Sequence, residues 1–371
     1  MKSFNVGRPS FIERLAVSAY RVPTSGPESD GTFEWNSTTL VVAELSAAGA
    51  PGVGYTYADV ATARLIEEHL ADAVIGRDPM AVPAAWEAMR HAVRNVGRPG
   101  IASAGIAAVD SALWDLKARL LGVPLVTLLG GVRNSVPVYG SGGFTSYSLD
   151  ELREQLAGWV ESGISRVKMK VGRDASTDIE RVRVAREAIG PSAELFVDAN
   201  GAYSRKQAMA FAERFSEYGV SWLEEPVSSD DLEGMRLIRD RAPAGMDIAA
   251  GEYGYDLMYF RRMLEAGAVD VLQADATRCA GVSEFLRVGA LCAAFGIPMS
   301  AHTAPSLHAH ACCALTSVRH VEYFHDHARI EQMLFDGASV PVDGALHPDC
   351  SRPGLGLDFK RADAARYAVS L

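Results

Sequence analysis

Six short apolar segments in the second half of the chain each end on an ionisable residue, and they follow one another at nearly constant spacing. Consecutive end residues are 23 to 28 residues apart, which is about the length of one strand followed by one helix. These end residues are Lys170, Asp198, Glu224, Glu252, Asp275 and His302. Because the carboxyl ends of the strands in a parallel α/β barrel meet at one rim, the pattern predicts a barrel with its chemistry at the strand ends.

The first part of the chain has a different pattern. Residues 11–20 and 38–46 alternate apolar and polar positions, which predicts antiparallel strands. Residues 61–121 have helical periodicity, and a glycine follows the last predicted turn. From Val136 onward, predicted strands and helices alternate through an eighth strand at residues 320–324.

Composition and charge exclude several classes of protein. The chain has 371 residues, 48% of them hydrophobic, and a formal net charge of −10. That charge disfavours nucleic acid and anionic membrane surfaces as partners. No apolar run reaches the ~18 residues of a membrane span, and the first ten residues contain no apolar signal region. The five cysteines form no CysXXCys pair, so we expect a cytoplasmic protein without disulfides.

Three carboxylates, those of Asp198, Glu224 and Glu252, end successive predicted strands and would converge at the rim of a barrel. Carboxylates brought together repel one another strongly unless a cation binds them. A set of oxygen ligands suits a hard ion, Mg²⁺ before Ca²⁺. The alternative is that each is an ordinary solvated acid. Glu225 points to the opposite face of its strand from Glu224, so only one of the two can bind the ion from the strand.

Lys168 and Lys170 are two residues apart, so they share one face of a strand, while Val167 and Met169 share the other. The outer face of a barrel strand packs on helices, which suits the apolar side chains and leaves the lysines in the barrel mouth. There each lysine would lower the pKa of the other and poise one of them as a base. The alternative is an edge strand with solvated lysines.

Asp275 and His302 end adjacent predicted strands. A carboxylate beside a histidine fixes the ring tautomer and raises the basicity of the ring, which supports a general acid/base. A zinc site made of His302, His308 and His310 is the less favoured alternative, because the last two lie in an Ala-rich stretch typical of helix packing and capping. The histidines of residues 325–327 are expected at the rim or in an interface.

These residues lie in motifs that resemble the enolase superfamily, in its mandelate racemase-like subgroup, and the resemblance covers nearly the whole chain. Its first part is AlaValAspSerAlaLeuTrpAspLeuLysAlaArgLeuLeuGlyValProLeu at 108–125, followed by LeuLeuGlyGly at 128–131. The later motifs are ValLysMetLys (167–170), ValAspAlaAsn (197–200), TrpLeuGluGluPro (222–226), AlaGlyGlu (250–252), LeuGlnAlaAsp (272–275), SerAlaHisThr (300–303) and ValGluTyr (321–323).

The resemblance implies an α/β fold that combines a modified TIM-type (β/α)7β barrel with an N-terminal α+β capping domain. We place the capping domain at residues 1–130 and the barrel at residues 131–354. Residues 355–371 would be a C-terminal tail that returns to the cap.

The resemblance also implies a role for each polar strand end. One Mg²⁺ ion per active site would be bound by Asp198, Glu224 and Glu252. Lys170 would be one acid/base. His302, oriented by Asp275, would be the other and would act on the opposite face of the substrate.

Two further residues would serve the substrate carboxylate. Lys168 would contact it and lower the pKa of Lys170, and Glu322 would be protonated and hydrogen-bonded to it. Together these groups would stabilise an enediolate. The implied reaction is Mg²⁺-dependent removal of the α-proton of a carboxylate substrate, most favourably in the dehydration of an acid sugar to a 2-keto-3-deoxy acid sugar. The alternatives are a racemase or epimerase of a 2-hydroxy or related carboxylate, and a non-catalytic homologue. We also expect a homo-oligomer.

Residues 23–32, rich in Pro, Gly and acids, predict a loop that is either a mobile lid or a plain solvated hairpin loop. The far end of the substrate would meet this part of the chain. The side chains expected there are Glu28, Asp30, Glu34, Trp35, Tyr55 and Tyr57. Acids and aromatic rings suit hydroxyl groups, whereas a second carboxylate would require arginine, so the sequence favours a monoacid sugar. Arg21 and Arg278 are the two arginines that could reverse this expectation.

Overall fold

Eight parallel strands form a closed barrel in the structure, a computed structural model that describes residues 11–371. The strands pair in chain order, and the last pairs with the first, so that Glu322 lies opposite Tyr139 in the register. The predicted barrel is therefore confirmed. Its strands are β4 (Val136–Gly142), β5 (Arg166–Lys170), β6 (Glu194–Asp198), β7 (Val220–Glu224), β8 (Asp247–Ala250), β9 (Val271–Ala274), β10 (Met299–Ala301) and β11 (Val318–Phe324).

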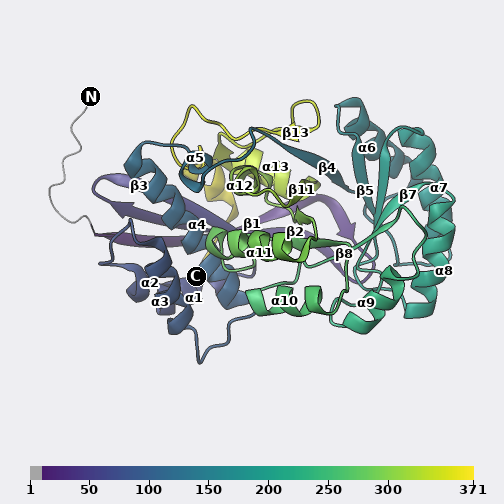
Figure 1. Cartoon of the computed structure of the whole chain (residues 1–371). Helices are drawn as coiled ribbons and strands as arrows, with labels where there is room; N and C mark the ends of the chain where they lie inside the picture. The colour runs from purple at the N-terminus through teal and green to yellow at the C-terminus, as the bar shows by residue number, and fades with distance from the viewer. Residues whose placement is uncertain (1–10) are drawn as a thin grey trace.

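A helix follows each barrel strand and covers its outer face (Figure 1). The serine and aspartate residues before two of these helices act as N-caps, because Ser204 accepts from the Gln207 N–H and Asp256 accepts from the Tyr259 N–H. The helices are α6 (Leu149–Glu161), α7 (Asp178–Ile189), α8 (Arg205–Ser216), α9 (Leu232–Arg239), α10 (Leu257–Glu265), α11 (Val282–Phe295), α12 (Pro305–Cys313) and α13 (His325–Leu334).

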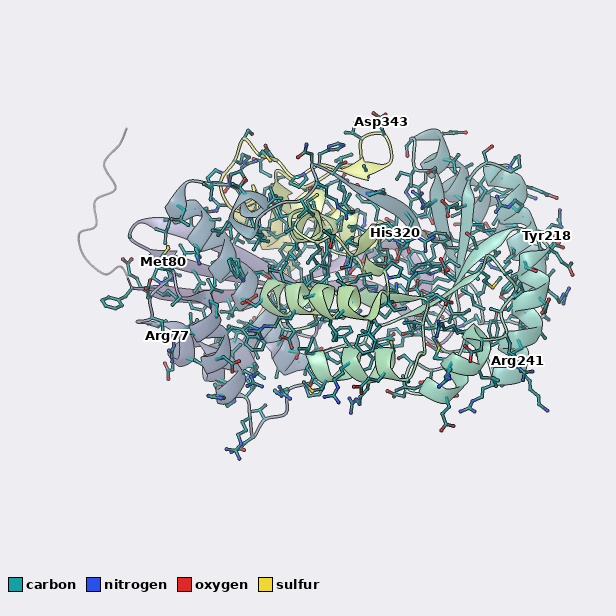
Figure 2. The ribbon with its side chains drawn as sticks, in the orientation of Figure 1. Arg77, Met80, Tyr218, Arg241, His320 and Asp343 are labelled. Carbon is teal, nitrogen blue, oxygen red and sulfur yellow. The ribbon has the colours of Figure 1, made fainter. Side chains whose placement is uncertain are left out.

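The two faces of each barrel strand carry different side chains. Val167 and Met169 belong to the large apolar core between the barrel and its helices, as their alternation with the lysines predicts. The inside of the barrel is filled by a smaller apolar cluster of Tyr139, Phe196, Trp222, Ala249 and Val271. Figure 2 shows His320 in this central part of the molecule, far from Tyr218 and Arg241 at the outer helices. The polar residues at the strand ends therefore lie above a packed apolar interior.

The N-terminal part is an antiparallel sheet covered by helices. Its strands are β1 (Arg14–Ser29), β2 (Glu34–Ala47) and β3 (Ala50–Tyr57), which confirms the predicted antiparallel strands. Its helical elements are α1 (Ala61–Leu65), η1 (Ile66–Leu70), α2 (Ala71–Val74), α3 (Val82–Ala92), α4 (Ile101–Leu121) and α5 (Leu125–Leu129). As predicted, α4 ends at a glycine, Gly122, whose φ of 67° is in the left-handed region.

The end of the chain returns to this sheet, where β15 (Ala368–Val369) pairs with β1 (Figure 1). The division into a cap of residues 1–130, a barrel of residues 131–354 and a tail of residues 355–371 remains our proposal. The remaining short elements are β12 (Phe335–Asp336), β13 (Ala345–Leu346), β14 (Asp358–Phe359), α14 (Arg361–Ala364) and η2 (Ala365–Tyr367).

Two buried carboxylates on α4 tie the cap to the rest of the molecule. Asp110 accepts from the backbone N–H and the hydroxyl of Ser283 at the start of α11. Asp115 accepts from the N–H of Val53 in the cap sheet and from the N–H of Leu355 at the start of the tail. The helix that links the two parts in sequence therefore also holds them together in space.

The prediction of a loop over residues 23–32 is wrong in extent. β1 continues to Ser29, and an irregularity in its pairing with β2 between Pro23 and Glu28 accommodates the proline- and glycine-rich stretch. The turn that follows is short. The carboxylate of Asp30 accepts from the N–H groups of Thr32 and Phe33, and its carbonyl accepts from Thr145 of the barrel. The tip of this hairpin is thus attached to the barrel.

No helix among residues 11–371 combines the length and the apolar composition that crossing a membrane would require. The expectation about the first ten residues lies outside the described part of the chain.

Candidate active site

The three predicted metal ligands meet at the carboxyl ends of neighbouring strands. Asp198 ends β6, Glu224 ends β7, and Glu252 follows β8. All three are buried, and one carboxylate oxygen from each lies within 4.8 Å of the others. Glu225 is buried too but does not belong to this group, as expected from its opposite direction. Its backbone is in the left-handed region with a φ of 37°, a costly conformation that needs support from the surrounding structure.

The charges of the carboxylates explain why a cation fits between them. Burial and the nearby charge of Asp198 raise the pKa of Glu224 to about 8, although Lys168 lies 2.6 Å from it. Burial also opposes ionisation of Asp198, but Lys170 and Lys168 hold its pKa well below the usual range. Negative charge is therefore crowded at this point, and an all-oxygen donor set of this kind suits Mg²⁺.

Both lysines of β5 lie inside the barrel mouth, as predicted, but their expected pKa shift is wrong. Burial and Lys168 lower the pKa of Lys170, yet the carboxylates of Asp198, Glu252 and Glu224 outweigh both and raise it. The Nζ of Lys170 lies 2.5 Å from Asp198. The pKa of Lys168 is also raised. The prediction counted the neighbouring lysine on the same strand and omitted the carboxylates that the adjacent strands bring to it.

His302 and Asp275 form the predicted pair. The Nδ1 of His302 lies 2.9 Å from Oδ2 of Asp275, so it carries the proton that it donates to this carboxylate. The other oxygen of Asp275 accepts from the N–H and the hydroxyl of Thr277. The remaining ring nitrogen, Nε2, lies 3.4 Å from Glu252 and 3.7 Å from Glu322. The free side of the imidazole therefore faces the carboxylates at the rim.

Glu322 differs from the expectation of a protonated side chain. Burial opposes its ionisation, but Lys168 at 2.9 Å and the nearby His302 hold its pKa at about 2. It also accepts from the backbone N–H of Thr303 at 3.2 Å. Glu322 is therefore the ionised partner of Lys168 in this structure. The motif alone gave no indication of how close the two side chains lie.

A pocket of about 550 Å³ lies between the strand ends and the cap hairpin. On the barrel side it is lined by Lys170, Glu252, His302 and Glu322 of the predicted set, and by Asn200 and Arg278. On the cap side, the lining includes three residues that the sequence analysis expected there: Asp30, Trp35 and Tyr57. The cap and the barrel therefore share one cavity, and the predicted acid/base residues face it.

The other residues expected at the cap side have different places. Glu28 is buried and does not line the pocket, and it accepts from the indole N–H of Trp35. Glu34 is exposed and pairs with Arg173. Tyr55 is buried and donates to Glu331. Of the two arginines in question, Arg278 lines the pocket and Arg21 does not.

Several lining residues were missed by sequence reasoning. Ser37, Thr38 and Thr39 lie in the first half of β2, and Asp59 follows β3. The available signal was weak, namely a run of hydroxyl residues at the start of a strand. His327, expected at the rim or in an interface, lines the pocket and stacks on Tyr57 with ring centroids 3.4 Å apart.

The two histidines of α12 bind backbone groups, as the packing interpretation predicts. His308 accepts from the N–H of Ala276 through Nε2, and its Nδ1 lies 2.7 Å from the carbonyl oxygen of Thr303. His310 accepts from the N–H of Val126. Within residues 11–371, the group of His, Cys, Asp and Glu side chains placed to hold a metal is Asp198, Glu224 and Glu252, which disagrees with the zinc alternative.

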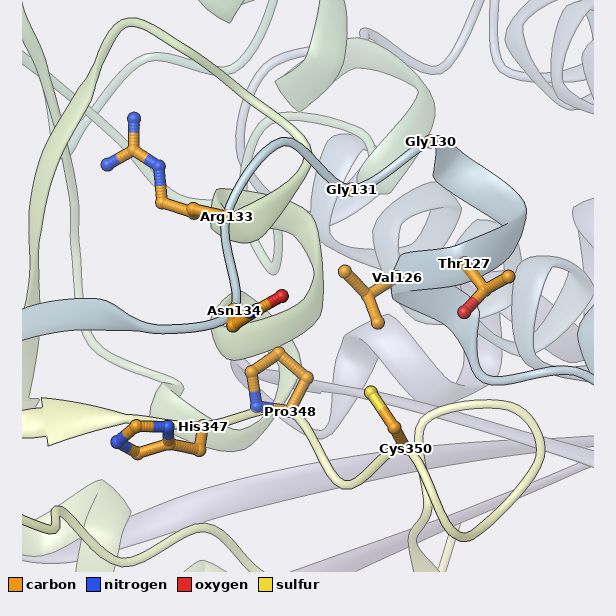
Figure 3. A pocket seen from close by; sticks show the side chains of 9 residues that line it. All are labelled: Val126, Thr127, Gly130, Gly131, Arg133, Asn134, His347, Pro348 and Cys350. Atoms are coloured by element: carbon orange, nitrogen blue, oxygen red, sulfur yellow. The ribbon is translucent and has the colours of Figure 1, made fainter.

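A second cavity, of about 540 Å³, lies where residues 126–134 meet the segment 347–350 (Figure 3). Arg133, one of its lining residues, donates to the carbonyl groups of Thr316 and Val318. None of the predicted acid/base or metal-binding residues lines this cavity. The candidate active site is therefore the pocket between cap and barrel.

The two parts of the chain each match a known family. Residues 18–130 match the family described as mandelate racemase / muconate lactonizing enzyme, N-terminal domain. Residues 151–364 match the family described as enolase C-terminal domain-like. The chain therefore belongs to the enolase superfamily, in its mandelate racemase/muconate lactonizing enzyme branch, which confirms the resemblance.

Three known proteins place the chain more closely. A mandelate racemase/muconate lactonizing enzyme-like protein from Rubrobacter xylanophilus has a crystal structure with a TM-score of 0.95 and 57% identity, covering 96% of this chain and 99% of that one. A 3,6-anhydro-alpha-L-galactonate cycloisomerase from Streptomyces coelicolor is 32% identical, over 94% of this chain and 98% of the relative. The structure of L-talarate/galactarate dehydratase from Salmonella typhimurium, liganded with Mg and L-lyxarohydroxamate, has a TM-score of 0.89 and 29% identity, covering 100% and 96%.

Proposed function

We propose that this protein is a Mg²⁺-dependent lyase that removes the α-proton of a monoacid sugar and dehydrates it to a 2-keto-3-deoxy product. One observation carries the proposal. Lys170 and His302 line the same pocket from the ends of β5 and β10, which stand three strands apart around the barrel; Asp275 holds His302 from behind, and three clustered carboxylates lie alongside. Two acid/base groups on opposite sides of a metal site are what α-proton chemistry on a carboxylate requires.

Asp198, Glu224 and Glu252 would hold the Mg²⁺. The structure of the Salmonella relative, which is liganded with Mg, supports the choice of ion. When bound, the ion would supply positive charge where the substrate carboxylate gains negative charge as the α-proton leaves. Lys168 would add to this stabilisation, because it is buried and already lies among the carboxylates. A charge held in a buried site acts more strongly than it would in water.

The chain's own side chains account for the proton transfers. His302 or Lys170 would take the α-proton, according to the configuration of the substrate. Lys170 could act as the base once a bound cation, in place of its own ammonium group, compensates Asp198 and Glu252. In a dehydration, the C–H bond at the α-carbon and the C–O bond at the β-carbon both break, and the leaving hydroxyl takes a proton from a general acid. His302 suits either role, because Asp275 fixes its Nδ1–H and leaves Nε2 facing the pocket. The enol that results becomes the 2-keto acid when its 3-carbon is protonated.

The charges of the pocket support a monoacid substrate. Arg278, the arginine that lines the pocket, lies 3.7 Å from Asp275, which is not one of the proposed metal ligands, so its positive charge is already compensated. The far wall consists of hydroxyl, acidic and aromatic groups from the cap. Such a wall binds sugar hydroxyls better than a second carboxylate. The Salmonella relative is named for L-talarate and galactarate, both diacids, so the substrate class has to be decided for this chain separately.

A screen of acid sugars with Mg²⁺, read as semicarbazide-reactive keto product, tests the proposal. We expect turnover of one or a few aldonates or uronates and none without the ion. Faster turnover of an aldarate than of any monoacid would contradict the substrate class. If the protein bound no Mg²⁺, the remaining hypothesis would be a non-catalytic homologue.

A second candidate, an isomerase, is favoured by the same two acid/base groups, because reprotonation on the opposite face inverts the α-carbon. The Streptomyces relative is named as a cycloisomerase. Deuterium exchange at the α-carbon in D₂O without formation of keto product would favour a racemase or epimerase over a dehydratase. The cytoplasmic location and the homo-oligomer remain predictions.

A further inference from the structure

The imidazole of His308 joins the two loops that carry the acid/base pair. His308 lies on α12 and is fully buried. Its Nε2 lies 2.9 Å from the backbone nitrogen of Ala276, and its Nδ1 lies 2.7 Å from the carbonyl oxygen of Thr303. Ala276 directly follows Asp275, and Thr303 directly follows His302. One ring therefore bridges the residues next to both members of the pair.

Only one form of the ring satisfies both bonds. The carbonyl oxygen of Thr303 can only accept, so Nδ1 must carry the proton, and the N–H of Ala276 can only donate, so Nε2 must be unprotonated. Burial lowers the pKa of His308, which agrees with this neutral tautomer. The ring is thus a fixed connector with one donor and one acceptor.

The backbone that His308 holds is strained. Thr303 and Ala304 have φ angles of 51° and 41°, and two successive non-glycine residues in the left-handed region need support from their surroundings. Thr303 also donates through its N–H to Glu322, and its hydroxyl lies 3.3 Å from Oδ2 of Asp275. A change in the position of Thr303 would therefore reach the groups around His302.

We propose that His308 is a positioning residue, which sets the orientation of His302 relative to Asp275 by tying their two loops together. This inference rests on the proposed function in one respect, namely that His302 transfers a proton in the reaction. His308 itself does not line the pocket, and its effect on the reaction is transmitted through Thr303 and Ala276.

His310, two residues further along α12, is a matched control. It is buried to a similar extent, and it accepts from the N–H of Val126 in α5. Within residues 11–371 it makes no hydrogen bond to the loops after Asp275 or His302. Replacing it removes a buried histidine from the same helix and leaves the bridge intact.

The first experiment compares kcat, KM and Tm for His308→Leu, His308→Gln and His310→Leu with Mg²⁺ saturating. We expect His308→Leu to lower kcat about 10- to 100-fold, since small misplacements of reacting groups have effects of this size, with KM changed less than threefold. His308→Gln should recover part of the loss, because its amide can both donate and accept. His310→Leu should lower Tm while kcat stays within twofold.

The proposal would be overturned by a wild-type kcat in folded His308→Leu. The proposal would also be overturned if kcat fell in proportion to Tm, and did so to the same degree in the His308 and the His310 variants. If His308→Leu does not fold, His308→Gln and His308→Asn are compared, since the shorter amide of asparagine cannot span both loops and should be the slower of the two. Equal kcat for these two variants would also reject the proposal.

A second measurement requires no substrate. In ¹⁵N-histidine-labelled protein, the Nδ1–H of His302 in its bond to Asp275 should give a low-field proton resonance, assigned by its loss in His302→Asn. His308→Gln should shift or broaden this resonance, and His310→Leu should not. If this resonance is unchanged in every folded His308 variant, the positioning role is refuted, even if the wild type is active. Absence of turnover in the wild type would refute the proposed function and leave this test in force.

Discussion

The two walls of the active-site pocket are built in different ways. The barrel wall consists of ionisable side chains at the ends of consecutive strands, where Lys168 lies 2.6 Å from Glu224 and 3.4 Å from Asp198. The cap wall consists mainly of hydroxyl and aromatic side chains from the β1–β2 hairpin and the end of β3, with few charges. The barrel wall is therefore suited to moving a proton and the cap wall to recognising hydroxyl groups. Changes in the first should affect the rate of reaction, and changes in the second the choice of substrate.

The largest effect is expected from His302→Asn. Loss of a general acid/base lowers kcat about 10²- to 10⁴-fold, and the neighbouring carboxylates should keep Mg²⁺ affinity within a few-fold of the wild type. Steady-state kinetics and a Mg²⁺ titration by calorimetry measure the two quantities. His347→Asn, at the second cavity, is the control and should leave both unchanged. A collapse of Mg²⁺ affinity in His302→Asn would show that His302 belongs to the metal site instead.

The barrel wall could be predicted from the sequence because its residues repeat with the strand-plus-helix period. Its electrostatics could not. The pKa of Lys170 is decided by Asp198 and Glu252, which come from other strands, and the charge of Glu322 by its approach to Lys168. The cap wall was predicted only in part. The alternation along β2 indicates which positions are buried, but it does not indicate that Thr39 faces the pocket between cap and barrel.

Removal of the metal should affect the barrel wall next most strongly. Without a bound cation the crowded carboxylates repel one another, so chelation should lower Tm. At 100 times the Kd, a ligand of the folded state stabilises it by about 2.7 kcal/mol. Differential scanning calorimetry across a Mg²⁺ series checks this. Glu252→Gln should lose most of the Mg²⁺-dependent rise in Tm, and a rise equal to that of the wild type would argue against Glu252 as a ligand.

A buried acid between cap and barrel should make stability depend on pH. Burial raises the pKa of Glu331 to about 7, above its value of about 4.5 in the unfolded chain, so the folded state binds the proton more tightly. The stability from this group is present below about pH 4.5 and is lost as pH rises towards 7, by up to about 3 kcal/mol. Urea unfolding of wild type and Glu331→Gln at pH 5 and pH 8 measures it. The glutamine variant keeps a hydrogen-bonding amide, and an equal pH dependence in both proteins would contradict the shift.

The smallest effect is expected at the cap wall, in Thr39→Val. The substitution keeps the branched shape that suits a strand and removes one hydroxyl from the pocket lining. Loss of a single hydrogen bond to a sugar hydroxyl costs about 0.5–1.5 kcal/mol, so KM for the best substrate should rise about 2- to 10-fold while kcat changes less than twofold. Thr127→Val, at the second cavity, is the matched control. If Thr39→Val lowered kcat as strongly as a change at the barrel wall, the division of labour between the two walls would be wrong, because a hydroxyl of the cap would then be acting on the reacting carbon.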